Sequence, residues 1–562
     1  MDTYRAFLAV VISFAILLGY QYFFVGFDSP QNPPNQQMEA PVTTQAPAGQ
    51  QPEIAGQQPQ VTTAPPVVVP QPAPTPVIQY ADAADITVEN NVFTAVFSEN
   101  GGALKNLVLK EYRETTAKDS PGKELVNSVA DLGFPLKFSW GGTIGQDLYY
   151  KSSTPNVSFV DGKASLVMTA DAGHGLTVVR TYTFTQDSYL IGLDITVKNG
   201  SGQTLQGTPQ LHQVNTPFEK AAGSTGMYQF NGAEAYMNGE LHEVKAKQYT
   251  DGPVTLQGSL MWAGFGGNYF LRGIVPLDGV GTSFVIQGSE DLTRTTLSGN
   301  LDTLQPGGEK SYDYKLFYGP KKVTLLRDIG YELERSVNYG WFDIIARPTL
   351  WLLNFLYGFV GNYGVAIILV TIMFKAAFWP ISQKGMKSMK NMQKLQPKMA
   401  KIREKYKDDP TRMNQEVMNL YKTYRVNPLG GCLPMVLQIP VFFALYKVLL
   451  QSIELRHAPF MLWITDLSAP DRLWIGFDIP YLGGLPVLTL LMGASMYIQQ
   501  KLTPTTADPT QAKIMQFLPI IFTFMFLNFA SGLVLYWFVN NLLSILQQQL
   551  INREKPKQAQ PA

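Results

Sequence analysis

The sequence is poor in cysteine, histidine and charged residues. Its 562 residues include one cysteine and four histidines, and only 15% are charged. The single Cys432 excludes an internal disulfide and a cysteine zinc site, and the scattered histidines form no HExxH-type metal site. P-loop and GxSxG motifs are absent, and a formal net charge of +1 argues against a general nucleic-acid-binding protein. We expect no metal, no cofactor and no specifically bound nucleic-acid sequence.

The N-terminal part combines an uncharged apolar run with a proline-rich stretch. Residues 6–27 carry no charge and are long enough to cross an apolar bilayer core of roughly 30 Å. No small-x-small cleavage site follows, so 6–27 is interpreted as an uncleaved first anchor after a short N-terminus at 1–5. Residues 28–80 contain 13 Pro and 11 Gln but no Lys or Arg, which predicts a disordered tether.

Residues 81–320 show the alternation that is typical of β-strands. Apolar side chains recur at every second position from Tyr189 to Val197 and again from Tyr312 to Tyr318. Gly- and Asn-containing breaks at 99–102 and 199–202 separate the runs. About 240 residues of this kind favour a β-sandwich domain. Its aromatic residues are compatible with a sugar-binding site, but an ordinary sandwich core explains them more simply.

From residue 321 the periodicity becomes helical and the apolar runs become longer. Residues 321–361 predict a linker with a polar helix at 321–338 and an interfacial amphipathic helix at 344–359, where Trp351 and Phe355 accompany Arg347. Apolar segments then follow at 362–380, 429–451, 485–501, 514–529 and 532–550, with a very short turn at 530–532 before the last. Together with the first anchor they predict six membrane spans. The 16 most apolar residues of the fourth and fifth spans make about 24 Å of helix each, so we expect local bilayer thinning.

The distribution of charge predicts how these spans are oriented. Residues 375–425 contain 13 Lys or Arg against four acidic residues, which places 381–428 in the cytoplasm by the positive-inside rule. The loop at 452–484 is net acidic and falls outside, whereas 502–513 and the tail at 551–562 are basic and fall inside. The N-terminus is therefore cytoplasmic, and the β domain lies on the opposite side of the membrane.

Lys375 interrupts the otherwise apolar second predicted span. A charge at the bilayer centre costs about 2.5–3.5 kcal/mol, so it usually faces a cavity or a partner. The alternative is snorkelling of the ammonium group to the cytoplasmic headgroups. The last five spans contain no acidic residue, which favours a polar groove or snorkelling over a buried ion pair. Other polar residues in the spans could hydrogen-bond between helices or line the same groove: Gln438, Ser495, Gln499, Asn528, Asn540 and Asn541.

The cytoplasmic segment predicts a basic helical hairpin. Methionines and lysines recur every three or four residues in its first helix, Asp408-Asp409-Pro410 breaks the pattern, and Asn427-Pro428 ends the second helix. The apolar faces are expected to pack together, with the lysines near anionic lipid. Methionine-rich surfaces also suit varied partners, and the basic face could contact ribosomal RNA phosphates. The candidate contact residues are Met386, Met389, Met392, Lys394, Lys398 and Met399.

Several motifs follow one another in a recognisable order. Lys375 is followed by Leu395-Gln396-Pro397-Lys398 in the hairpin, then by Asn427-Pro428-Leu429-Gly430-Gly431-Cys432 and by Ala458-Pro459-Phe460. Farther along come Asp466-Leu467-Ser468, Leu502-Thr503-Pro504-Thr505-Thr506 and Ser531-Gly532-Leu533-Val534-Leu535-Tyr536-Trp537. Over roughly 340–550 the chain strongly resembles the YidC/Oxa/Alb family of membrane protein insertases. The anchor, tether and β domain at 1–340 match its Gram-negative members through looser motifs.

The resemblance implies a polytopic α-helical inner-membrane protein with a five-helix insertase core and a periplasmic β-supersandwich akin to sugar mutarotases. Members insert and fold membrane proteins, without nucleotide hydrolysis, through a hydrophilic groove that contains a basic residue. Gram-negative members often have arginine there, and Lys375 keeps the charge but loses bidentate pairing. The groove residues implied here are Thr371, Lys375, Gln438, Tyr536 and Trp537.

The resemblance also implies a set of partners. They are nascent inner-membrane proteins, the Sec translocon (SecYEG and SecDF), the ribosome, the signal recognition particle or its receptor, and membrane lipids.

Two other classes of protein remain as alternatives. A secondary transporter would also have polar residues in its spans, but it normally shows repeated halves, and the sequence has no internal repeat. An intramembrane protease would need a base for Ser495, and the predicted spans contain no histidine. A non-enzymatic insertase is therefore the favoured interpretation.

Overall fold

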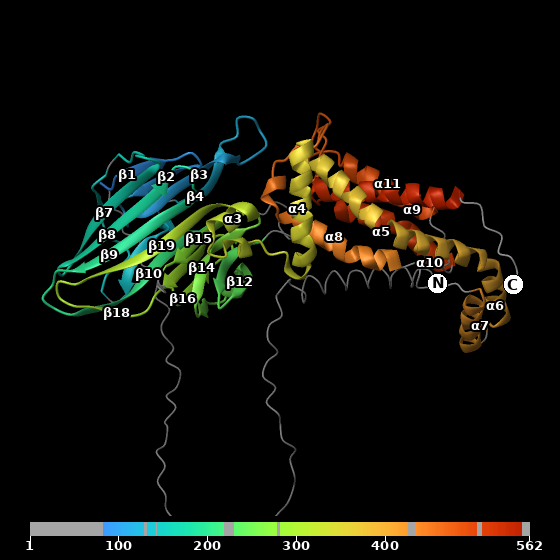
Figure 1. Cartoon of the computed structure of the whole chain (residues 1–562), viewed down its shortest axis with the longest axis horizontal. Coiled ribbons are helices and arrows are strands. Elements are labelled where there is room, and N and C mark those ends of the chain that lie inside the picture. Colours follow the sequence, from blue (N-terminus) through green and yellow to red (C-terminus); the bar gives the residue numbers. More distant parts are fainter. Residues whose placement is uncertain are drawn as a thin grey trace, which may run out of the picture. The chain divides into compact units, whose positions relative to one another are not determined.

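The computed structural model describes residues 82–128, 132–141, 143–154, 156–218, 230–277, 281–407, 409–424, 433–502 and 509–553 (Figure 1). The chain divides into two units, Met1–Pro76 and Val77–Ala562, and all the described residues belong to the second. The predicted first anchor at 6–27 and tether at 28–80 lie outside the described residues. So do the motifs at 427–432 and 503–506 and the tail beyond Arg553.

The largest sheet of the β domain has nine antiparallel strands in a meandering order. That order is β12 (Glu240–Lys245), β11 (Asn231–Met237), β14 (Leu260–Gly267), β15 (Phe270–Pro276), β19 (Glu309–Pro320), β9 (Leu190–Asn199), β8 (Leu176–Thr185), β7 (Lys163–Gly173) and β6 (Lys151–Ser152). The alternation predicted from the sequence is confirmed in β9, where Ile191, Leu193, Ile195 and Val197 are all buried.

Two smaller sheets complete the described part of the domain. One contains β1 (Asp85–Glu89), β2 (Phe93–Ser98), β3 (Ala103–Arg113) and β4 (Gly122–Asn127) in chain order. The other has the order β13 (Val254–Gln257), β16 (Ser283–Gly288), β17 (Thr293–Ser298), β10 (Leu205–Asn215) and β18 (Asp302–Leu304), with β5 (Lys137–Gly141) also paired to β10. A single helical turn, α2 (Ala246–Tyr249), follows β12.

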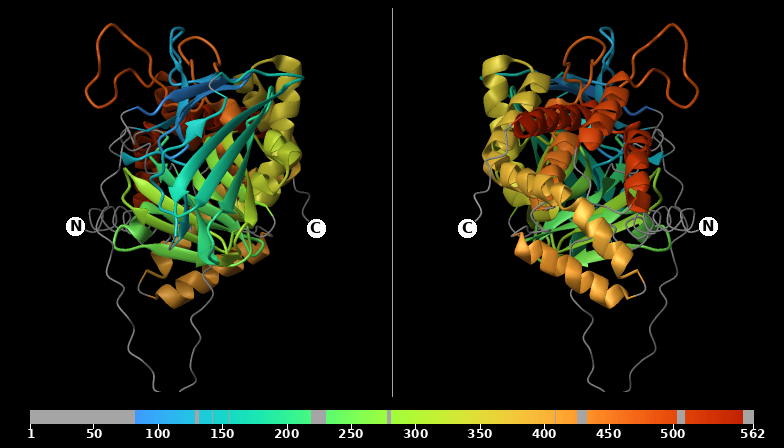
Figure 2. Two further views of the ribbon diagram at one scale, coloured as in Figure 1. Left: turned by 90° about the vertical axis from the view of Figure 1, so that its left-hand side faces the viewer. Right: turned by 90° about the vertical axis from the view of Figure 1, so that its right-hand side faces the viewer.

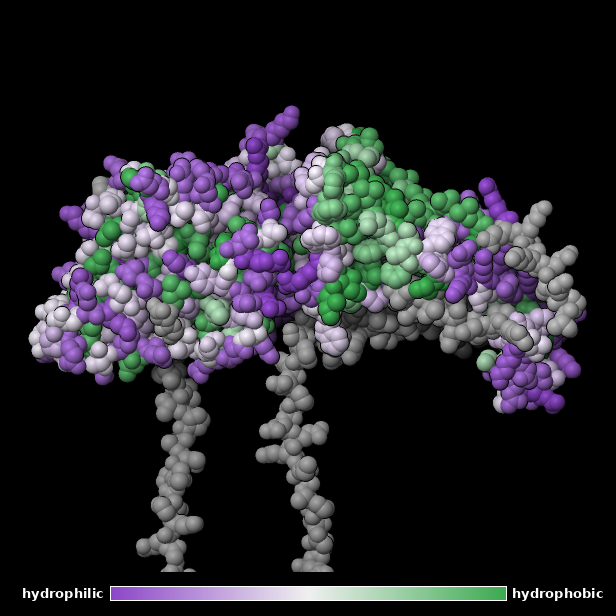
Figure 3. All heavy atoms as spheres, in the orientation of Figure 1, coloured by the Kyte–Doolittle hydropathy of each residue, from purple (hydrophilic) through white to green (hydrophobic). Residues whose placement is uncertain are grey.

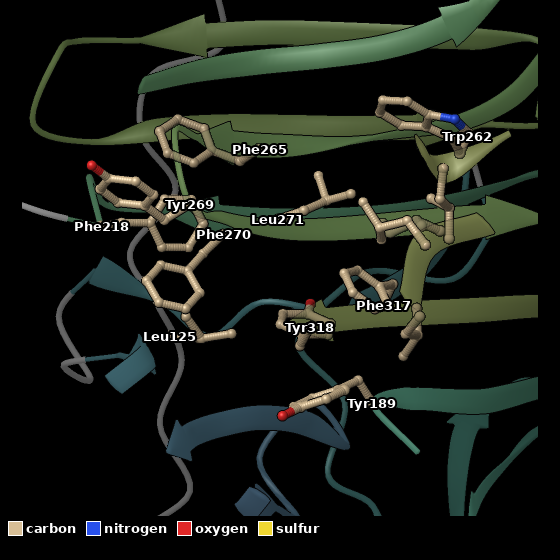
Figure 4. Packing of buried hydrophobic residues seen from close by; sticks show 14 of the residues in the cluster. Leu125, Tyr189, Phe218, Trp262, Phe265, Tyr269, Phe270, Leu271, Phe317 and Tyr318 are labelled. Carbon is tan, nitrogen blue, oxygen red and sulfur yellow. The ribbon is translucent and has the colours of Figure 1, made fainter. Parts of the chain in front are cut away.

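Aromatic side chains form the core between these sheets. The indole of Trp140 on β5 donates to the Tyr312 hydroxyl on β19 at 2.9 Å, and the rings of Phe97 and Tyr182 lie 4.5 Å apart. Each contact joins a smaller sheet to the nine-stranded one. Figure 4 shows part of this cluster, including Trp262 and Tyr318. Because the largest aromatic residues are buried, they serve as core, as the simpler interpretation of the sequence expected.

The linker after the β domain is less helical than the sequence indicated. The helix α3 covers only Val323–Ile329 and ends at Gly330, whose φ of +87° suits glycine. A short 3₁₀ helix, Leu333–Ser336, follows, so the prediction of one polar helix over 321–338 was wrong. The helix predicted over 344–359 is present as α4 (Asp343–Val360). On its exposed stripe the Trp351 ring stacks on Phe355, and Phe355 meets Phe359 edge to face.

The second predicted span continues into the hairpin as one helix. The helix α5 runs from Tyr363 to Lys394, through Pro380, and ends at Leu395. The sequence had predicted that the first hairpin helix continues up to Asp408-Asp409-Pro410. Pro397 explains the break, because its ring cannot follow an uninterrupted helix. The hairpin then consists of α6 (Gln396–Lys405) and α7 (Pro410–Thr423), and Pro410 begins α7 as predicted, with Asp409 as its N-cap.

Four more helices follow: α8 (Leu433–Gln451), α9 (Val487–Leu502), α10 (Pro509–Phe526) and α11 (Ser531–Arg553). The turn between the last two lies at 527–530, slightly earlier than predicted, because Ser531 and Gly532 already belong to α11. Hydrophobic side chains gather over the helical region, whereas the same face of the β domain is mixed and largely hydrophilic (Figure 3). Among the described residues α5 alone is long and apolar enough to cross a membrane, and Gln438–Gln451 and Met515–Phe526 are shorter apolar stretches.

Candidate functional site

A cleft lies among α5, α8 and α11, around the side chain of Lys375. Its cavity has a volume of about 30 Å³, and its walls are mostly apolar. Polar groups lie among apolar and aromatic ones in the lining, which consists of Thr371, Phe374, Lys375, Phe378, Ile381, Ser382, Gln438, Val441, Tyr536 and Asn540. The site therefore offers one cation and several hydrogen-bonding groups in an apolar setting.

The ammonium group of Lys375 is held by α11. Its Nζ donates to Ser544 Oγ at 2.6 Å and to Asn540 Oδ1 at 3.4 Å. Gln438 on α8 donates to the same Asn540 oxygen at 2.9 Å. Asn540 and Ser544 are four residues apart, so they lie on one face of α11. Three helices thus meet in one hydrogen-bonded group.

The partners of Lys375 in this group are neutral. None of the ten residues that line the cleft is acidic, so the lining leaves the lysine charge uncompensated. Hydroxyl and amide oxygens solvate the ammonium group without neutralising it. The ammonium group lies between helices, within hydrogen-bonding distance of Asn540 and Ser544 of α11.

The structure brings together four of the five groove residues that the resemblance implied. Thr371, Lys375, Gln438 and Tyr536 all line the cleft. Trp537 does not line it and lies in an aromatic cluster between α8, α10 and α11. Its ring centroid is 4.7 Å from that of Phe442, 5.1 Å from Phe526 and 6.0 Å from Phe522.

The sequence analysis named Asn540 but missed Ser544 and Gln547, which continue the same polar row along α11. Ser544 holds Lys375, and Gln547, one turn farther, accepts from Ser382 of α5 at 3.1 Å. A second row faces α9, where Asn541 donates to Ser495 at 3.0 Å. The spacing of Asn540, Ser544 and Gln547 was a detectable signal, because such a row in an apolar helix marks a polar contact.

The candidate residues of the hairpin fall into two groups. Met392 and Met399 are buried, Met386 and Met389 are half-buried, and Lys394 and Lys398 are exposed. The Tyr421 hydroxyl of α7 donates to Met399 Sδ at 3.1 Å, and Lys398 contacts Tyr424. The apolar faces of α6 and α7 therefore pack against each other, as expected, and Lys394 and Lys398 are exposed on the hairpin surface.

No group of metal-ligating side chains occurs in the described parts of the chain. The cleft holds one lysine, hydroxyls and amides. These groups can attract and hydrogen-bond a polar segment of another chain.

Comparisons with known proteins identify relatives along almost the whole chain. Residues 85–352 match the family described as "YidC periplasmic domain", and residues 355–558 match "60Kd inner membrane protein". The membrane protein insertase YidC of Pelobacter propionicus is 44% identical over 558 residues, which cover 98% of this chain and 99% of that protein. Its counterpart from Syntrophobacter fumaroxidans is 40% identical over 560 residues, with the same coverage.

A solved structure described as an active YidC insertase with its first transmembrane domain resolved aligns with 82% of this chain and 91% of its own. Between this chain and that solved chain, the TM-score is 0.35 and the sequence identity is 20%.

Proposed function

The chain belongs to the YidC family of membrane protein insertases, and from this membership we propose that it inserts and folds inner-membrane proteins through the cleft around Lys375. It is an inner-membrane protein with a large periplasmic β domain, and the family is not enzymatic. The observation that carries the proposal is a lysine in an apolar cleft, held by neutral groups of α11.

We propose six membrane spans with both termini in the cytoplasm. The first is 6–27, and the others are 362–380, 429–451, 485–501, 514–529 and 532–550, which form a five-helix core. The basic hairpin at 381–428 supports this orientation by the positive-inside rule. The β domain, for which the family relationship suggests a supersandwich, then lies in the periplasm after the tether at 28–80.

The uncompensated lysine suits the capture of an acidic segment. A short polar part of the substrate enters the cleft from the cytoplasm and meets hydroxyl and amide groups instead of lipid. At an effective dielectric constant near 20, opposite unit charges about 4 Å apart attract each other by roughly 4 kcal/mol. A carboxylate beside Lys375 thus recovers part of the cost of leaving water. No nucleotide is needed for this step.

The apolar span of the substrate then moves into lipid against the outer faces of α8 and α10. These helices expose the apolar side chains of Ile439, Phe517, Ile520 and Phe524. Burial of apolar surface contributes about 25 cal/mol per Å² and drives release into the bilayer. The 16 residues of α9 make about 24 Å of helix, so local thinning of the bilayer would shorten the remaining path.

The substrates are nascent inner-membrane proteins. We further propose that the chain acts alone or beside the Sec translocon (SecYEG and SecDF), and that the basic hairpin meets the ribosome, the signal recognition particle or its receptor. Exposed Lys394 and Lys398 support an electrostatic contact of this kind.

Site-specific photocrosslinking tests the proposal. A photoreactive phenylalanine analogue replaces Phe378, which lines the cleft, or Met373, a matched position on the same helix that is exposed outside it. Ribosomes that carry a short single-span nascent chain are then added to inverted membrane vesicles. We expect adducts from position 378 and far fewer from position 373.

A second substrate without acidic residues in its translocated segment tests the role of the charge. Equal yields of adducts from positions 378 and 373 would show that the cleft is not the substrate path. The absence of adducts from both positions, while the substrate still inserts, would show the same.

A further inference from the structure

The loop between α8 and α9 is attached to the N-terminal end of α5. Asn362, the N-cap of α5, donates its side-chain amide to the Phe460 carbonyl at 2.9 Å. The Phe460 ring lies so close to Gly364 that a β-carbon there would meet it at 2.0 Å. The stretch 460–464 is therefore fixed at the level where α5 begins.

The next part of the loop is attached to the N-terminal ends of α9 and α11 and to the C-terminal end of α10. Asp471 accepts from the backbone amides of Leu488 at 2.5 Å and Thr489 at 3.1 Å, and so caps α9. Arg472 donates to Asn528, just beyond α10, at 2.9 Å. The Ser531 amide at the start of α11 donates to the Ala469 carbonyl at 2.8 Å.

Two apolar tips extend from this attached region. The first consists of Met461 and Leu462, and the Leu462 side chain is 83% exposed. The second lies between Leu473 and Leu485, which pair in an antiparallel bridge that closes the base of the tip. Its exposed apolar residues are Trp474, Ile475, Phe477 and Tyr481. Loops from this orange part of the chain project from the helical region in Figure 2.

We propose that the two tips insert into the headgroup region of the outer leaflet and anchor the outer ends of the core helices to the lipid surface. The inference rests on the proposed function in one respect, namely that α5 and α8–α11 span the bilayer. If they do, a loop fixed to their ends on the β-domain side lies at the membrane surface. Its apolar tips then face lipid headgroups rather than bulk water.

The chemistry of the tips favours lipid over a protein partner. Trp and Tyr are enriched at membrane–water interfaces, where their rings sit at headgroup level. Residues 460–464 carry no charge, and Asp478 is the one charged residue between 473 and 485. The surface also continues, along the chain, into exposed Leu490 and Leu491 of α9. A loop that holds the short helix α9 at a fixed depth would keep its ends at the interface.

Spin-label accessibility tests the anchoring. In a Cys432→Ser background, single cysteines are introduced by Leu462→Cys and Phe477→Cys, labelled with a nitroxide and reconstituted in vesicles of phosphatidylethanolamine and phosphatidylglycerol. Collision with oxygen and with a water-soluble nickel chelate reports depth. Leu490→Cys on α9 serves as the buried-in-lipid reference, and Glu290→Cys on an exposed turn of the β domain serves as the water reference.

We expect both tip labels to be shielded from nickel relative to position 290 and to lie shallower than position 490. Tip labels as accessible to nickel as position 290 would overturn the anchoring. Shielding that arises only after a Sec translocon is added would also overturn it, in favour of a protein partner. Insertion activity measured on the same vesicles keeps the two proposals separate. Tips accessible to nickel together with normal insertion would contradict only the anchoring proposal. Shielded tips without insertion would contradict only the proposed function.

Discussion

The Nζ atom of Lys375 lies 2.6 Å from the hydroxyl oxygen of Ser544, which itself donates to the Asn540 carbonyl one turn earlier at 2.7 Å. The hydroxyl proton is therefore directed to the backbone, and the oxygen lone pairs are left for the ammonium. This arrangement fixes the cation by a second helix rather than by an opposite charge. Two side chains that are 169 residues apart in the sequence thus set where a substrate meets the positive charge.

The role of Ser544 in holding Lys375 gives the first prediction. Ser544→Ala removes the shorter of the two hydrogen bonds and leaves the lysine charge in place, so the ammonium becomes less well positioned. A hydrogen bond to a charged group contributes about 1.5–3 kcal/mol. We expect a several-fold lower insertion rate for substrates with an acidic translocated segment and little change for neutral ones, measured in proteoliposomes. Ser544→Thr keeps the oxygen and serves as the control. A loss shared by both substrates, or by both variants, would show that Ser544 acts through packing.

The charge of Lys375 gives the second prediction. Lys375→Ala should impair the insertion of substrates with acidic translocated segments most, because the attraction disappears while the cleft remains. Lys375→Arg keeps the positive charge and should be tolerated. Complementation of a depleted strain and insertion assays with matched acidic and neutral substrates measure both variants. An equal loss for all substrates in Lys375→Ala would contradict charge attraction as the cause.

The local patterns in this sequence were reliable where one side of an element is buried. Burial of Ile191, Leu193, Ile195 and Val197 in β9 follows directly from the two-residue period of a strand. The helix α4 was recognisable for a similar reason, since its aromatic residues recur on one face. In both cases a single buried or exposed face imposes a period that neighbouring residues alone reveal.

Features that depend on distant partners could not be predicted. The Lys375–Ser544 contact joins positions 169 residues apart, and the rotation of α11 that creates it depends on packing. Periodicity alone could not show that α5 runs on through Pro380 as far as Lys394, because a helix can accommodate proline when its surroundings compensate. The early end of α3 at Gly330 illustrates the opposite case, in which one backbone conformation overrides a helical pattern.

A buried ion pair at the end of the β domain gives the third prediction. Lys321 Nζ lies 2.9 Å from Glu234 Oε1, and both side chains are almost fully buried. Burial raises the pKa of Glu234 to about 7, although Lys321 opposes this shift. Lys321→Met leaves the carboxylate uncompensated and should cost about 3–5 kcal/mol of stability, whereas Glu234→Leu combined with Lys321→Met should be close to neutral.

Denaturant unfolding of the β domain in the detergent-solubilised protein measures these differences. The exposed pair Lys198–Glu309, whose charged atoms are 3.0 Å apart, provides the control, and Lys198→Met should cost less than about 1 kcal/mol. A double variant as unstable as Lys321→Met would mean that the two residues stabilise the fold by packing rather than as a pair.

The pH dependence of the β domain gives the fourth prediction, through His212. Its Nε2 lies 2.8 Å from Ser139 Oγ and its Nδ1 lies 3.1 Å from Thr296 Oγ1. Burial lowers the pKa of His212 from 6.5 to about 4, with nearby Asp147 opposing the shift and Lys137 adding to it. Between these pH values the unfolded chain binds a proton that the folded chain does not. Stability is therefore retained above pH 6.5 and falls as the pH drops towards 4.

His212→Gln removes this titration and should flatten the stability profile between pH 6.5 and 4, even if it lowers stability at pH 7. The thermal midpoint of the β-domain transition, followed at several pH values in the full-length protein, measures the slope. His174→Asn changes an exposed histidine and should leave the slope as it is in the unmodified protein. Because a proton-linked slope depends on the titrating group and not on the overall stability, a His212→Gln profile as steep as the original would assign the acid sensitivity to other residues.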